Sequence, residues 1–323
     1  MSTGIEWTDE TWNPTTGYTK VSPGCDNCYA EVMYERFNGK GSFATVKMHS
    51  QRLAIPFHWR KPRKVFVNSM SDLFHQDVTD FFIAEVFAVM ALNPRHTFQI
   101  LTKRHARMRS LLSSPYFRVL VDRALRVRGK DPLPYDEAAR FALPNVWLGV
   151  SVEDQKWADI RIPALLDTPA AVRFLSCEPL LGPVDLIPAL KQWASGLDIR
   201  INRHLHWVIV GGESGHGARP MHPDWARALR DQCAAAEVPY LFKQWGEWQD
   251  GSADRRTQRG VDHIVHRNGE HVLASQYQDS EIVTGRAERR MGACFMSRVG
   301  KKSAGRELDG RTHDGYPVEE ISA

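Results

Sequence analysis

Cysteine and long apolar runs are both scarce in this sequence, and each scarcity argues against a class of protein. The chain has only 5 cysteines in 323 residues, an odd number that does not suit the disulfide framework of a small secreted domain. No apolar run approaches the roughly 18 residues of a membrane-spanning helix. The first residues, Met1 to Trp7, lack the basic and apolar regions of a signal peptide. We therefore expect a soluble, cytoplasmic protein with no membrane contact.

A large excess of charge of one sign is also missing. Lys and Arg number 42 against 38 Asp and Glu, which gives a net charge of +4. This balance permits a polyanionic partner such as a nucleic acid but does not require one. Hydrophobic residues make up 42% of the chain, so one α/β domain of this length can bury a sizeable core.

Short apolar runs rich in β-branched and aromatic residues recur through the middle of the chain, each followed by a polar or glycine-containing turn. These predicted strands are 65–67, 98–101, 146–150, 173–175, 207–210 and 240–242. Between them, apolar residues that recur three and four positions apart predict helices at 80–92, 105–126, 154–166 and 223–236. Alternating strands and helices indicate parallel pairing, in an open doubly wound sheet or in a complete or partial (β/α) barrel. We favour the barrel.

The carboxyl-terminal part of the chain differs from this rhythm. Residues from 251 to about 285 are polar, and a basic block follows at 298–306. We therefore divide the chain into a barrel-like domain with an N-terminal cysteine loop, 1–250, and a polar excursion with a C-terminal segment that packs on the barrel, 251–323.

The turns after the predicted strands carry groups that suit ligand contact. Glu153 and Glu178 follow two neighbouring strands and are candidates for proton transfer or for binding a sugar. Lys103 follows another strand and, together with Arg104 and Lys243, is expected to form a cationic rim for phosphate or carboxylate. The alternative for each turn is a structural one, because Ser, Asp and Glu also cap the helix that follows.

Glycines surround one carboxylate in the segment 211–215. Gly211 and Gly212 let the backbone approach a ligand closely, while Glu213 can accept hydrogen bonds from an ammonium group or a ribose. Glycine pairs also serve simple tight turns, so the motif by itself is weak.

The most informative segment is a Gly- and Pro-punctuated loop that holds Cys25 and Cys28 and ends at a helix start. Two thiols separated by two residues can face one metal ion or one iron–sulfur cluster. Zinc is disfavoured because the chain has no second close Cys pair, and a thioredoxin-type redox pair lacks its preceding strand. An iron–sulfur site with one unconventional ligand remains.

Several motifs together resemble a known family, the phage-associated three-cysteine-motif family of unknown function. They are Trp12-Asn-Pro, Val21-Ser-Pro-Gly-Cys25, Cys28-Tyr-Ala-Glu31, Leu101-Thr-Lys-Arg104, Leu148-Gly-Val-Ser151, Glu178-Pro-Leu-Leu-Gly182, Gly211-Gly-Glu-Ser-Gly215, Phe242-Lys-Gln-Trp-Gly246 and Gly300-Lys-Lys-Ser-Ala-Gly-Arg306. That family in turn resembles radical S-adenosylmethionine enzymes. The resemblance implies a partial barrel whose first loop holds a [4Fe-4S] cluster on three cysteines and leaves one iron for S-adenosylmethionine.

One position departs from that pattern. The family's first cysteine, seven residues before Cys25, is Tyr18 in this chain. Either another ligand completes the site, from Cys177 or from the Tyr18 oxygen, or the cluster has been lost. The implied cofactor-binding residues all follow predicted strands: Ser151, Gly211, Gly212, Glu213 and Ser214.

Two functions of different classes follow from the resemblance. The first is a radical S-adenosylmethionine enzyme that acts on a nucleic acid or a modified base, with Glu178, Glu153 and Lys103 as catalytic candidates. The second is a nucleic-acid-binding or accessory phage protein, with or without a partner protein, that keeps the fold without the cluster. A third hypothesis, zinc-assisted hydrolysis, requires Cys25 and Cys28 to bind zinc with His ligands.

Overall fold

One parallel sheet of seven strands organises the chain. The computed structural model describes residues 3–134, 141–191, 204–250, 262–273 and 292–317. The sheet order is β1-β4-β5-β6-β7-β8-β9, and every neighbouring pair is parallel. The strands are β1 (Glu10–Trp12), β4 (Lys64–Val67), β5 (Thr97–Thr102), β6 (Val146–Ser151), β7 (Val172–Cys177), β8 (Trp207–Gly211) and β9 (Tyr240–Gln244).

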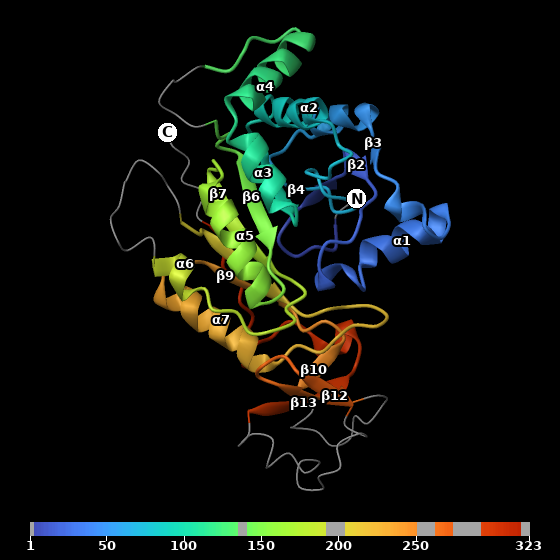
Figure 1. The fold of residues 1–323 in the computed structure, drawn as a ribbon, viewed down its shortest axis with the longest axis vertical. Helices are drawn as coiled ribbons and strands as arrows, with labels where there is room; N and C mark the ends of the chain where they lie inside the picture. Colours follow the sequence, from blue (N-terminus) through green and yellow to red (C-terminus); the bar gives the residue numbers. More distant parts are fainter. Residues whose placement is uncertain (1–2, 135–140, 192–203, 251–261, 274–291, 318–323) are drawn as a thin grey trace, which may run out of the picture.

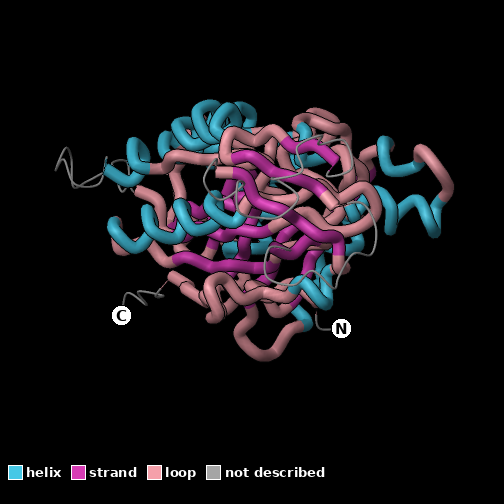
Figure 2. The backbone as a smooth tube through the Cα atoms, turned by 90° about the horizontal axis from the view of Figure 1, so that it is seen from below, coloured by secondary structure: helices cyan, strands magenta, loops and turns pink. Residues whose placement is uncertain are grey.

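This sheet curls into a half-barrel whose convex face is covered by helices (Figures 1 and 2), so the predicted partial (β/α) barrel is confirmed. The helices are α1 (Tyr29–Asn38), α2 (Asp80–Ala91), α3 (His105–Leu112), α4 (Pro115–Val127), α5 (Gln155–Asp167), α6 (Ile187–Lys191), α7 (Pro223–Ala235) and α9 (Lys301–Ala304). The six predicted strands all form within a residue or two of the expected bounds. Strand β1, which the apolar patterns did not predict, pairs with β4 and supplies the sheet edge from which the cysteine loop departs.

One predicted helix was wrong in extent. The pattern over 105–126 predicted a single helix, but the chain forms α3 and α4 with a break at Ser113 and Ser114. Pro115 has no backbone N–H, so it suits the first turn of a new helix, and the Ser114 side chain accepts a hydrogen bond from the Tyr116 N–H.

The smaller sheets lie outside the half-barrel. An antiparallel sheet has the order β10-β13-β11-β12, with β10 (Trp248–Asp250), β11 (His263–His266), β12 (His271–Leu273) and β13 (Ala293–Arg298). The short strands β2 (Thr15–Thr16) and β3 (Lys47–Met48) pair beside the N-terminal loop. Much of the predicted polar excursion, at 251–261 and 274–291, lies outside the described residues.

The two faces of the half-barrel are packed differently. The convex face meets the helices in an extended aliphatic and aromatic core. The concave face holds a separate cluster of large side chains: Trp7, Phe66, Trp147, Phe174, Trp207, Ile209 and Leu241. Tyr316 packs against this cluster, and the Trp207 indole N–H donates to the Gly315 carbonyl over 2.8 Å. In the described part of the chain, no helix is sufficiently long and apolar to cross a membrane.

Candidate functional site

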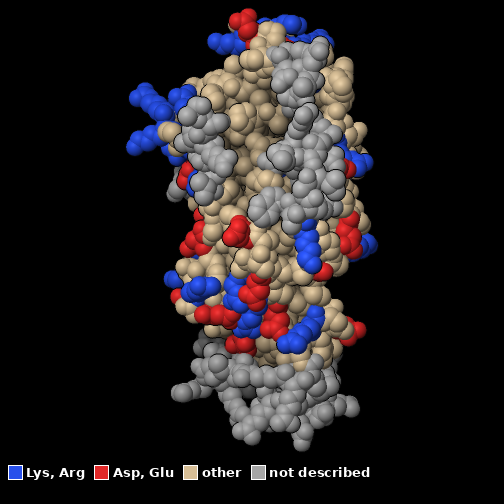
Figure 3. Space-filling model, turned by 90° about the vertical axis from the view of Figure 1, so that its left-hand side faces the viewer, with Lys and Arg blue, Asp and Glu red and all other residues tan. Residues whose placement is uncertain are grey.

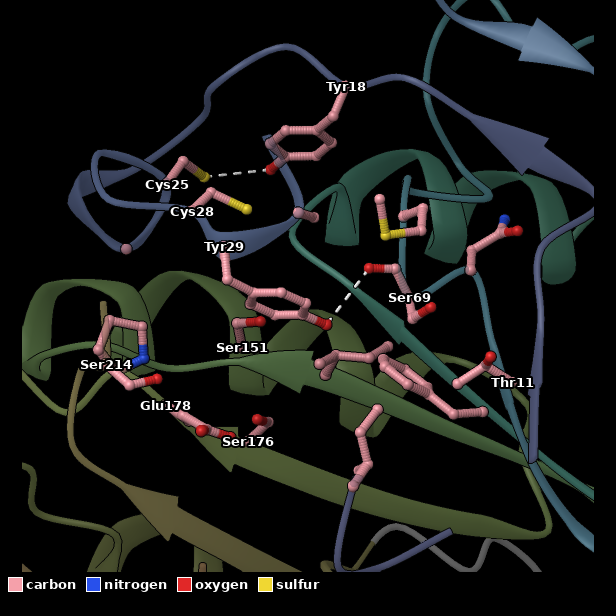
Figure 4. A pocket seen from close by; sticks show the side chains of 18 of the residues that line it. Thr11, Tyr18, Cys25, Cys28, Tyr29, Ser69, Ser151, Ser176, Glu178 and Ser214 are labelled. Atoms are coloured by element: carbon pink, nitrogen blue, oxygen red, sulfur yellow. Dashed lines mark hydrogen bonds between the residues drawn. The ribbon is translucent and has the colours of Figure 1, made fainter. Parts of the chain in front are cut away.

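A cavity of about 600 Å³ lies at the carboxyl ends of the parallel strands. Figure 4 shows its two sides, with the cysteine loop on one and the strand ends with their polar groups on the other. The lining groups from the strand ends include Ser69, Lys103, Ser151, Ser176, Glu178, Ser214 and Lys243. The predicted location of the site, at the carboxyl ends of the strands, is therefore where the structure has its cavity.

The cysteine loop crosses this end of the half-barrel and brings both thiols to the cavity. Cys25 closes a short 3-10 turn at Pro23–Cys25, and Cys28 is the N-cap residue of α1. Both side chains line the cavity (Figure 4). The structure therefore brings the two thiols together at one cavity.

Tyr18 contacts the first of these thiols. Its phenol oxygen lies 3.3 Å from the Cys25 sulfur. Burial raises the pKa of Tyr18, and the nearby Cys25 and Asp72 raise it further. Burial also opposes ionisation of Cys25, but the Lys103 charge and hydrogen bonds from Tyr18 and the loop backbone outweigh it and lower the pKa of that thiol. We therefore assign the Tyr18 hydroxyl as donor and the Cys25 sulfur as acceptor.

Cys177, the other candidate ligand, does not join this pair. Successive side chains of a strand point to opposite faces, and at the end of β7 Ser176 and Glu178 line the cavity while Cys177 lies in the convex-side core. The Cys177 side chain is completely buried, and this burial, with Cys233 nearby, raises the pKa of its thiol. The structure therefore separates Cys177 from Cys25 and Cys28.

Glu153 contacts the cysteine loop from the buried side and holds it in place. It is fully buried and pairs with Arg161 over 2.7 Å, and it accepts a hydrogen bond of 2.6 Å from the Ser22 hydroxyl. A Cβ atom at Gly24 would lie 2.6 Å from the Glu153 carboxylate oxygen, so the loop can lie this close only with glycine there. Glu153 is absent from the cavity lining and lies behind it. Arg161 is a partner that the sequence did not predict.

The predicted cationic rim is present but engaged with protein groups. The Lys103 ammonium lies 3.1 Å from the Ser151 hydroxyl and 3.8 Å from Glu153. Arg104 donates to the Thr19 hydroxyl over 2.6 Å, which ties it to the cysteine loop.

A charge pair on the cavity wall joins Glu178 and Lys243. The Lys243 ammonium lies 2.8 and 3.0 Å from the two Glu178 oxygens, and Gln244 donates to the same carboxylate over 3.2 Å. Burial by itself lowers the pKa of Lys243, but Glu178 outweighs it and raises that pKa above its ordinary value. Lys243 is therefore charged at neutral pH. A Cβ at Gly211 would lie 3.3 Å from the Glu178 carboxyl carbon, so this glycine leaves room for the pair.

The glycine-rich turn after β8 packs closely against other parts of the protein. A Cβ at Gly212 would lie 2.0 Å from the Trp245 carbonyl oxygen. Glu213 pairs with Arg219 over 2.7 Å and accepts a hydrogen bond of 3.1 Å from Asn27, which lies between the two cysteines. Glu213 therefore fastens the cysteine loop to the turn after β8, and Gly212, Glu213 and Ser214 all line the cavity. Arg219 was not predicted from the sequence.

The donor set does not match a cluster held by three thiolates. Two cysteines line the cavity, and none of its lining residues is a histidine. Within the part of the chain that the structure describes, no group of three or more His, Cys, Asp or Glu side chains is arranged to hold a metal ion. A zinc site has the same difficulty, because it needs two more Cys or His ligands beside Cys25 and Cys28.

Comparisons with known proteins place this chain in a family. A search of curated proteins finds no match. One solved structure is described as "Spore photoproduct lyase complexed with dinucleoside spore photoproduct" and shares 11% sequence identity with this chain. The match covers 86% of this chain and 72% of the chain in that structure, with a TM-score of 0.37. At that TM-score the likeness carries no argument about function. The profile of a family described as "Protein of unknown function (DUF5131)" matches residues 2–317, and the chain therefore belongs to this family.

Proposed function

We propose that this protein binds S-adenosylmethionine in the cavity at the carboxyl end of the half-barrel. The observation that carries the proposal is the Glu178–Lys243 pair, which presents a carboxylate and an ammonium side by side on the cavity wall. The resemblance to radical S-adenosylmethionine enzymes suggests the ligand, and the charges of the site agree with it.

The amino-acid end of such a ligand is a zwitterion. Its ammonium group can donate to Glu178, and its carboxylate can accept from Lys243. Each of these two side chains then replaces part of the Glu178–Lys243 hydrogen bonding with a bond to the ligand. Lys103, which also lines the cavity, offers a second cation. Glu213 is already bonded to Arg219 and Asn27, so the ammonium-binding role that the resemblance implied for Glu213 passes to Glu178 in our proposal.

The rest of the cavity suits a nucleoside. Its volume of about 600 Å³ is within the range of roughly 300–1,000 Å³ for small-molecule pockets. Hydroxyl groups of Ser151 and Ser176 are available for a ribose, and the Tyr29 ring forms one wall, where it can stack on a base. When bound, S-adenosylmethionine supplies an activated sulfonium group. The protein's own residues bind the ligand, orient it and exclude water around it.

A radical reaction would also need the iron–sulfur cluster that the resemblance implies. Because the donor set holds only Cys25 and Cys28, we derive no step through a cluster. The proposed function is therefore ligand binding on an enzyme-like fold.

Nucleic-acid binding by the basic rim has less support. Lys103, Arg104 and Lys243 each bond to a protein acceptor, which reduces the charge available to phosphates. Over the lower half of the face in Figure 3, acidic and basic side chains are interspersed rather than separated by sign.

Calorimetric titration with S-adenosylmethionine tests the proposal directly. We expect saturable binding to the wild type and weaker binding of methionine or adenosine alone, because each fills half of the cavity. Lys243→Gln and Glu178→Gln should each weaken binding by about 10-fold or more, since a charged hydrogen bond contributes about 1.5–3 kcal/mol.

The matched control is Lys61→Gln. Lys61 is an exposed lysine that precedes β4, at the end of the sheet opposite the cavity. It should bind as the wild type does. Absence of saturable binding by the folded wild type would contradict the proposal, as would equal losses in the control and in Lys243→Gln. Salt-dependent DNA binding without ligand binding would favour the nucleic-acid alternative instead.

A further inference from the structure

Tyr18 stands where the family that this chain resembles has its first cysteine. Tyr18, Cys25 and Cys28 all line the cavity, and the phenol oxygen of Tyr18 lies 3.3 Å from the Cys25 sulfur (Figure 4). The side chain at position 18 therefore lies beside the first of the two thiols.

The phenol itself is a poor substitute for a thiolate here. Four-iron clusters are held by Cys thiolates. The Tyr18 side chain ends in a phenol oxygen, which lies 3.3 Å from the Cys25 sulfur as a hydrogen-bond partner of that thiol. Tyr18 therefore fills the space beside Cys25 without adding a third thiolate.

Other donors near the cavity are already used. Cys177 lies in the core on the opposite face of β7. Asp72 accepts hydrogen bonds from the Thr102 hydroxyl over 2.7 and 2.9 Å and from the Lys103 backbone N–H over 3.0 Å. Glu178 pairs with Lys243. Cys177 is therefore separated from the two loop thiols, and Asp72 and Glu178 are both bonded to protein groups.

The cysteine loop is also anchored to the half-barrel by hydrogen bonds. Ser22 donates to Glu153 over 2.6 Å, Thr19 lies 2.8 Å from the His75 ring nitrogen, and Asn27 donates to the Gly217 carbonyl over 2.8 Å. These contacts fasten the loop that carries both thiols at the cavity.

We propose that Tyr18 prevents a four-iron cluster from assembling in this chain, and that the single substitution Tyr18→Cys creates the third thiolate that assembly requires. This inference does not depend on S-adenosylmethionine binding, which is measured separately by titration.

Anaerobic reconstitution with ferrous iron and sulfide tests it. Iron and sulfide per chain and the visible absorption are measured for the wild type, Tyr18→Cys, Tyr18→Phe and Tyr18→Cys combined with Cys28→Ala. We expect about four irons, with matching sulfide and a broad visible band, in Tyr18→Cys only. Tyr18→Phe is the matched control, because it removes the hydroxyl from Cys25 without adding a ligand, and it should stay colourless.

Two results would overturn the inference. One is a wild-type or Tyr18→Phe protein that takes up about four irons with sulfide. The other is a Tyr18→Cys protein that stays iron-free although its thermal unfolding matches that of the wild type. If Tyr18→Cys does not fold, the wild type and Tyr18→Phe still decide whether the natural chain excludes the cluster.

Discussion

The two halves of the concave face differ sharply although the same strands build both. Toward the amino ends of the strands, Trp147, Phe174 and Trp207 fill the half-barrel, with ring centroids of Phe174 and Trp207 5.8 Å apart. Toward the carboxyl ends, Ser151 and Ser176 face the open cavity. Because side chains on one face recur every second residue, a strand can give a ring to the filled half and a hydroxyl to the open half.

This difference indicates a division of labour along each strand. The filled half stabilises the fold by burying large apolar side chains, and the open half leaves polar groups where a ligand can reach them. Substitutions in the filled half should therefore lower stability, and those in the open half should change binding.

The largest effect should come from Trp207→Ala. Removing this fully buried ring leaves a cavity beneath Tyr316 and should lower the free energy of unfolding by about 3–5 kcal/mol, measured by denaturant titration. Ser176→Ala, in the open half, should change stability by less than about 1 kcal/mol. Equal losses in the two variants would remove the distinction between the halves.

A smaller loss is expected from Gly149→Ala. A Cβ at Gly149 would lie 2.4 Å from the Phe174 ring, so the added methyl overfills the packed half and should cost about 1–3 kcal/mol in the same assay. Combining it with Phe174→Leu should cost less than the sum of the two single changes, because the smaller side chain makes room. Strict additivity would show that the ring is not what Gly149 accommodates.

Between pH 7 and 5, the smallest effect is a pH dependence at the amino end of β8. Burial, with His204 and Arg173 nearby, lowers the pKa of His206 to about 3. Because the folded state disfavours the charged ring, stability is complete above the unfolded pKa of about 6.5 and falls as the pH drops from there toward 3, by at most about 1.4 kcal/mol per pH unit.

His206→Asn removes this proton and keeps an acceptor for the Arg173 backbone N–H. The stability of this variant relative to the wild type should therefore increase as the pH falls from 7 to 5. A difference between the two proteins that is constant over this range would show that His206 does not titrate on unfolding.

Parts of the candidate site could be predicted because their signals are local. The Cys25 and Cys28 spacing and the Gly and Pro residues around them indicated one loop site, and both thiols line the cavity. The helix predicted at 154–166 forms as α5, and its N-cap Asp154 accepts a hydrogen bond from the Trp157 N–H. The alternation of side chains along β7 could also have been used. It places Cys177 on the opposite face from Ser176, away from the cavity.

The sequence by itself determined the succession of the core strands and most of the helices between them, the parallel pairing of those strands and the end of the sheet where the cavity lies. Those features depend on periodicities and turn residues that act within a few positions of one another. Only the tertiary structure decided that Glu153 pairs with Arg161, that Glu213 pairs with Arg219, and that Glu178 faces the cavity with Lys243. A carboxylate has the same local sequence signature whether it is bonded or open to a ligand, because its partner is chosen by packing between distant segments.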